Sequence, residues 1–184
     1  EEGWLDVYPQ DLIKILSYNG EIWSVPVNIH RANVMWYNKA VFADNNLQPP
    51  KTMDEFFTVA EKLKAAGIIP LALGESWTEV HLFETVLLGT LGPDKYIGLW
   101  AGTTDWKSAE VTKALENYDS MLTYVNEDFA ALTWDQATQL VIDGTAAMNV
   151  MGDWAEGYFK SKGWTPGVEF GWAPSPGSAG AARR

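Results

Sequence analysis

The segment Ala146-Ala147-Met148-Asn149-Val150-Met151-Gly152-Asp153-Trp154 predicts a strand that passes directly into a helix. Its first six residues form a mostly apolar run, which is typical of a buried strand. Glycine ends this run, and aspartate is a residue type that favours the start of a helix. A carboxylate and an indole therefore follow directly after a buried strand.

The same arrangement occurs earlier in the chain, where the apolar run 68–73 precedes a predicted helix over 78–91. Helices outnumber strands, and the two kinds of element alternate. Further helices are expected over 9–17, 39–44, 52–67, 108–125, 133–144 and 153–160, and further strands over 21–27, 33–37 and 168–172. This pattern predicts an α/β fold with a short mixed sheet flanked by helices.

Three of these helices carry detailed signals. Thr52 with Glu55, and Thr133 with Gln136, have the spacing of a capping box. In helix 108–125 one apolar stripe is expected to be buried. Its members are Val111, Leu115, Tyr118, Leu122 and Val125.

The composition excludes several functions. The net charge is −11, so the surface repels phosphate backbones and we expect no nucleic-acid partner. Cysteine is absent and there are two histidines, which excludes thiolate metal sites and disfavours a histidine-rich one. The common nucleophile, phosphate-loop and zinc-protease motifs are also absent. We expect no catalytic residue, metal or cofactor.

Glu75, Trp77 and His81 lie where strand 68–73 passes into the next helix. Trp77 and His81 are four residues apart, so both rings project from one face of its first turn. Ligands of open α/β sheets bind outside the carboxyl ends of the strands, which favours a binding role for all three residues. The alternative is a capped helix whose tryptophan packs against a neighbouring element.

Asp153 and Trp154 occupy the corresponding place after strand 146–151. An indole offers its π face to the apolar C–H face of a pyranose, while carboxylates and imidazoles bond hydroxyl groups. The alternative is that Asp153 only caps the helix and Trp154 is a core ring. We interpret Asp153 as both cap and ligand, and we expect Trp154 to be partly exposed beside Trp77 and His81.

His30 lies in Asn28-Ile29-His30-Arg31, between two strand-like segments. Its imidazole can donate to or accept from a hydroxyl group. A lone histidine near a bend is more often a structural hydrogen-bonding residue, and position alone favours that interpretation.

Four segments, in this order, resemble motifs of family 1 extracellular solute-binding proteins, the sugar-capturing components of ABC importers. They are 21–27 (EIWSVPV) with 33–39 (NVMWYNK), 49–56 (PPKTMDEF), 73–82 (LGESWTEVHL) and 146–154 (AAMNVMGDW). The segment 73–82 is more similar to the glucose- and mannose-type members than to maltose-binding protein. The resemblance covers residues 1–177.

The resemblance implies a two-lobe receptor that closes about a hinge, holds a sugar between its lobes and docks on a membrane permease. It implies a monomer in the periplasm or outside the cell, with no enzymatic activity. Trp154 matches the stacking tryptophan of the family. Trp77 and its neighbours match the aromatic and acidic loop that lines the cleft, and His30 falls just past the hinge strand.

The family is longer than this chain, so the resemblance implies most of one lobe of a periplasmic-binding-protein fold. Residues 1–20 would be a remnant of the first lobe, 21–172 the second lobe, and 173–184 the crossover and tail. Two other functions remain open. One is a glycosidase fragment, since glycosidases also use tryptophan platforms, and the other is an aromatic-rich module that binds protein.

Overall fold

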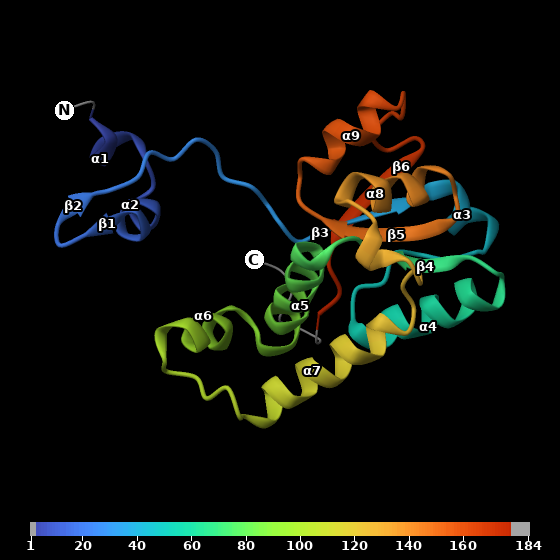
Figure 1. The fold of residues 1–184 in the computed structure, drawn as a ribbon, viewed down its shortest axis with the longest axis horizontal. Coiled ribbons are helices and arrows are strands. Elements are labelled where there is room, and N and C mark those ends of the chain that lie inside the picture. The colour runs from blue at the N-terminus through green and yellow to red at the C-terminus, as the bar shows by residue number, and fades with distance from the viewer. Residues whose placement is uncertain (1–2, 178–184) are drawn as a thin grey trace. The chain divides into compact units, whose positions relative to one another are not determined.

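A computed structural model describes residues 3–177 of the chain (Figure 1). The chain divides between His30 and Arg31 into two compact units. The first unit contains the helices α1 (Trp4–Val7) and α2 (Gln10–Leu16) and an antiparallel pair of short strands, β1 (Ser17–Tyr18) and β2 (Glu21–Ile22). The residues of the predicted tail from 178 onward lie outside the described part.

The strand expected over 21–27 is wrong beyond Ile22. Residues 23–33 have no regular secondary structure. An extended segment becomes a strand only when its backbone groups pair with a neighbouring strand. Within residues 3–177 no such ladder includes residues 23–27.

The second unit is built on a four-stranded sheet in the order β4-β5-β3-β6. Its strands are β3 (Val34–Asn38), β4 (Ile69–Ala72), β5 (Ala146–Met151) and β6 (Phe170–Pro174). β4 runs parallel to β5, whereas β3 is antiparallel to both β5 and β6. The sheet is therefore mixed, as predicted.

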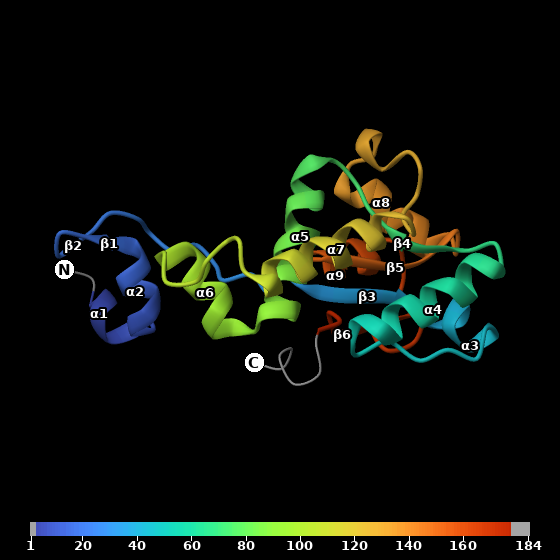
Figure 2. The same cartoon turned by 90° about the horizontal axis from the view of Figure 1, so that it is seen from below.

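Helices cover both faces of this sheet (Figure 1 and Figure 2). One apolar cluster is shared by the sheet with α3 (Lys39–Asp44), α4 (Met53–Ala65), α5 (Ser76–Leu91), α6 (Pro93–Ala101) and α7 (Ala109–Leu122). A second cluster lies under α8 (Trp134–Ile142) and α9 (Ala155–Ser161). A 3-10 turn at Phe129–Ala131 joins α7 to α8. No helix within residues 3–177 is long and apolar enough to cross a membrane.

The two predicted capping boxes differ. At α8 the box is complete, and the Thr133 N–H donates to Gln136 Oε1 at 2.9 Å. At α4 the Thr52 hydroxyl accepts from the Glu55 N–H at 3.2 Å. The Glu55 carboxylate accepts instead from the Lys51 N–H, at 2.7 Å, so only half of that box forms.

Helix α6 is not predicted by the sequence analysis, which ends a helix at residue 91 and places no element directly after it. Gly92 has φ 77° and does end α5. Pro93 is then the first residue of α6, a position where its missing N–H removes no helical hydrogen bond. Gly92 and Pro93 therefore join α5 directly to α6.

The stripe predicted for α7 is wrong at Leu115, which is 48% exposed. The buried residues of α7 are instead Val111, Ala114, Asn117 and Met121. The helix also ends at Leu122, because the residues that follow run beside β4. The Leu71 N–H there donates to the Tyr124 carbonyl at 3.2 Å.

Candidate functional site

Three aromatic rings meet at the start of two helices in the second unit. Trp77 and His81 lie one turn apart on α5, with ring centroids 6.2 Å apart and an interplanar angle of 25°. Trp154, at the N-terminal end of α9, lies with its ring centroid 6.2 Å from each of the other two. The structure thus brings together the rings of three of the six predicted site residues, which we call the three-ring cluster, and a fourth, Glu75, bonds to Trp77.

Sheet topology explains why residues so far apart in the sequence meet. β4 and β5 are parallel neighbours, so both strands end at the same edge of the sheet. Each continues through a short loop into a helix, α5 after β4 and α9 after β5. The carboxyl ends of parallel strands are where open α/β sheets place their ligands.

Glu75 holds the indole of Trp77 in place. Its Oε1 accepts a hydrogen bond of 2.9 Å from Trp77 Nε1. The Glu75 backbone is fixed as well, since its N–H donates to the Leu132 carbonyl at 2.8 Å and its carbonyl accepts from the Thr78 N–H at 2.8 Å. Trp77 remains 40% exposed, so an anchored ring still faces solvent.

His81 is half-buried within the cluster. Burial lowers its pKa, against the smaller effects of a hydrogen bond to the Ala32 backbone and of the Glu84 carboxylate. Its Nε2 is buried and has no hydrogen-bond partner among the described residues. A neutral imidazole of this kind can donate through one nitrogen and accept through the other.

Asp153 does not cap α9, and that part of the prediction is wrong. The helix begins at Ala155 with Trp154 in the N-cap position and no side-chain cap. Asp153 is instead paired with Arg31: its N–H donates to the Arg31 carbonyl at 2.9 Å, and its Oδ2 accepts from the Arg31 N–H at 3.1 Å. A partner so distant in sequence leaves no local signal, which is why the prediction missed it.

His30 is the last residue of the first unit and is exposed. The three-ring cluster belongs to the second unit. A role for His30 in ligand binding therefore stays a prediction.

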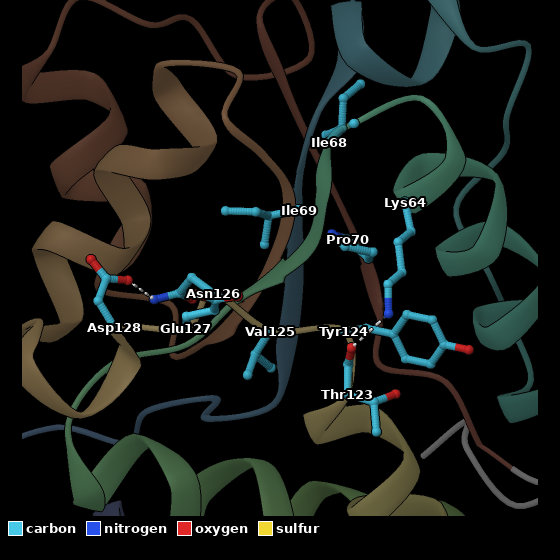
Figure 3. Close-up of a pocket in the computed structure, with 11 residues that line it drawn as sticks. Lys64, Ile68, Ile69, Pro70, Thr123, Tyr124, Val125, Asn126, Glu127 and Asp128 are labelled. Atoms are coloured by element: carbon cyan, nitrogen blue, oxygen red, sulfur yellow. Dashed lines mark hydrogen bonds between the residues drawn. The ribbon is translucent and has the colours of Figure 1, made fainter.

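A groove of about 530 Å³ lies elsewhere, between the start of β4 and the segment that follows α7 (Figure 3). Lys64 on its rim donates to the Thr123 carbonyl at 3.3 Å, and Asn126 Nδ2 donates to Asp128 Oδ1 at 2.8 Å. It lies at the amino end of β4, opposite to the end that carries the cluster, so we do not regard it as the ligand site. Residues 3–177 hold no group of three or more His, Asp or Glu residues suited to a metal ion.

Comparison with known proteins extends over nearly the whole chain. Residues 1–183 match the family model described as bacterial extracellular solute-binding protein. An uncharacterized ABC transporter extracellular-binding protein of Pyrococcus horikoshii is 43% identical, over 92% of this chain and 39% of the relative. A probable sugar-binding periplasmic protein of Mesorhizobium japonicum is 40% identical, over 98% of this chain and 44% of the relative.

Among solved structures, a chitin oligosaccharide binding protein has 27% identity and a TM-score of 0.78. That match covers 90% of this chain and 42% of the other. The chain thus spans about two-fifths of the length of the curated relatives and of this solved structure.

Proposed function

The chain belongs to the bacterial extracellular solute-binding proteins, and from this premise we propose that it forms the sugar-contacting surface of an ABC importer's receptor. The three-ring cluster carries this proposal. Trp77 and Trp154 supply indole rings, and a pyranose presents an apolar C–H face that such rings bind. By analogy with other aromatic platforms, each ring should contribute about 1–3 kcal/mol of binding free energy.

Polar groups beside the rings would bond the hydroxyl edge of the sugar. His81 Nε2 has no partner among the described residues, so a hydroxyl group that reached it would satisfy a buried polar atom. The carboxylates of Glu75 and Asp153 each already accept a hydrogen bond, and a carboxylate has several acceptor sites. Together these groups suit a neutral, hydroxyl-rich ligand.

The remaining parts of the proposal rest on the relatives. One is named as an extracellular-binding protein of an ABC transporter, which supports a permease as partner, and the other as a periplasmic sugar-binding protein; both names support a location outside the cytoplasmic membrane. We assign the second compact unit, from Arg31 to residue 172, to the second of two lobes and the first unit to the first lobe; this moves the expected boundary from residue 20 to His30, because β2 pairs with β1. If the sugar is held between two lobes, this chain supplies only one of the two surfaces that line the binding cleft.

Binding is favoured over catalysis. Glycoside hydrolysis needs two carboxyl groups facing each other across the scissile bond. The carboxylates of Glu75 and Asp153 are held by hydrogen bonds to different partners, Glu75 to the Trp77 indole and Asp153 to the Arg31 backbone, and neither bond pairs one carboxylate with the other. The matched relatives whose names state a role are named as binding proteins.

The proposal is tested by titrating the 15N-Trp-labelled chain with glucose, mannose, xylose and diacetylchitobiose. With one surface of the cleft we expect dissociation constants in the millimolar range, about −4 kcal/mol. The indole resonances of Trp77 and Trp154 should shift, and those of Trp100 and Trp106 should stay in place. Shifts confined to Trp100 and Trp106, or release of reducing sugar from an oligosaccharide, would contradict the proposal.

A further inference from the structure

The indole of Trp154 lies directly over Gly152. A Cβ atom added at Gly152 would fall well inside van der Waals contact with three atoms of the six-membered ring of that indole, Cζ3, Cη2 and Cε3. Gly152 is buried, and it is not among the glycines of positive φ. The need for glycine here is therefore one of space, since its backbone conformation is open to other residues.

The backbone at Met151 and Gly152, which lies under the Trp154 indole, is held by hydrogen bonds from the core. The buried Trp36, 4% exposed, donates from Nε1 to the carbonyls of Met151 and Gly152, at 3.2 and 3.3 Å. The Gly152 carbonyl also accepts from the Ala155 N–H at 3.0 Å, in the first turn of α9. The end of β5 is therefore held against moving away from the indole.

The next residue is fixed as well. Asp153 and Arg31 exchange two hydrogen bonds, of 2.9 and 3.1 Å, that tie the loop to the segment leading into β3. With the backbone held on both sides, a side chain at position 152 would have to displace the indole.

We propose that Gly152 is a positioning residue that sets where the Trp154 ring lies, and through it the geometry of the three-ring cluster. The ring centroid of Trp154 is 6.2 Å from those of both Trp77 and His81, so lifting the indole from Gly152 changes its relation to both. The consequence for sugar affinity rests on the proposed function, whereas the placement of the ring does not.

The variant Gly152→Ala adds the single atom that meets the ring. Gly157→Ala is a matched control, because a Cβ at Gly157 meets nothing within 4 Å and lies in the neighbouring helix α9. Trp154→Ala, alone and combined with Gly152→Ala, completes a double-mutant cycle. The measurements are the NOEs between the Trp154 and His81 rings, the urea midpoint and the sugar titration.

Gly152→Ala should abolish the NOEs, lower the urea midpoint and weaken sugar binding at least tenfold, while Gly157→Ala changes affinity less than twofold. In the Trp154→Ala background, Gly152→Ala should leave the urea midpoint unchanged. If Gly152→Ala does not fold, folding of the double variant supports the proposal and its failure overturns it. Unchanged NOEs in Gly152→Ala also overturn it. If the wild-type chain binds none of the sugars and Gly152→Ala still loses the NOEs, the positioning role is upheld and the proposed function is rejected.

Discussion

The indoles of Trp77 and Trp154 lie with their ring centroids 6.2 Å apart, although one follows β4 and the other follows β5. Trp77 is fixed through its Nε1 by Glu75, and Trp154 is fixed by its contact with Gly152. The two indoles are held by different interactions and form one surface, to which His81 adds an imidazole.

Trp36 supports this surface from the core, so its truncation should damage the fold. Trp36→Ala removes a buried ring and its Nε1 hydrogen bonds to the carbonyl groups of Met151 and Gly152. We expect a loss of about 3–5 kcal/mol in the free energy of unfolding. Urea denaturation of the chain measures it, and a loss below about 1 kcal/mol would contradict the packing described here.

Substitution of Glu75 should loosen Trp77 with little effect on the fold. Glu75→Ala removes the acceptor of the Trp77 Nε1 hydrogen bond. We expect sugar affinity to fall by about three- to tenfold, since a hydrogen bond to a charged group contributes about 1.5–3 kcal/mol at most and solvent replaces part of it. Calorimetry or NMR titration measures the affinity. An unchanged affinity together with an immobile Trp77 ring would contradict this role.

His81 should make stability depend on pH. Its pKa in the folded chain is lowered by burial from 6.5, so the unfolded chain takes up a proton at higher pH than the folded chain. The stability from a neutral His81 is complete above pH 6.5 and is lost as the pH falls through 6.5 toward the folded pKa. In His81→Gln, the fall in unfolding free energy between pH 7 and pH 5 should be smaller. An identical fall in both proteins would contradict the prediction.

The register of α7 gives a further test. Met121 is 1% exposed, whereas Leu115 belongs to the predicted stripe but is exposed in the structure. Met121→Ala should cost about 2–5 kcal/mol of stability and Leu115→Ala less than about 0.5 kcal/mol. Urea midpoints of the two variants measure both losses. Equal losses would contradict the register of the structure, and a larger loss in Leu115→Ala would favour the register that the sequence analysis predicts.

Local pattern predicted much of the fold and part of the candidate site. Runs of apolar residues located β4 and β5, and helical spacing placed Trp77 beside His81. Two of the errors come from interactions with residues distant in the sequence. The pairing of Asp153 with Arg31 and the end of α7 beside β4 both depend on tertiary contacts, which leave no periodicity in the sequence.

The contact between Gly152 and Trp154 was missed for a different reason. The sequence shows a glycine after a strand, which is read as a break in the strand. The backbone conformation of Gly152 is open to other residues. Glycine is needed there because the Trp154 indole folds back over it and leaves no room for a Cβ atom. That relation becomes visible only when the side chains are placed.

The central claim is that Trp154 binds sugar, and the affinity of Trp154→Ala tests it most directly. The matched control is Trp100→Ala, which removes an indole that is 59% exposed on α6, outside the three-ring cluster. For the sugar that wild type binds best, Trp154→Ala should lose about 1–3 kcal/mol of binding free energy, and Trp100→Ala should retain wild-type affinity. Unchanged binding by Trp154→Ala, or an equal loss in both variants, would contradict the account.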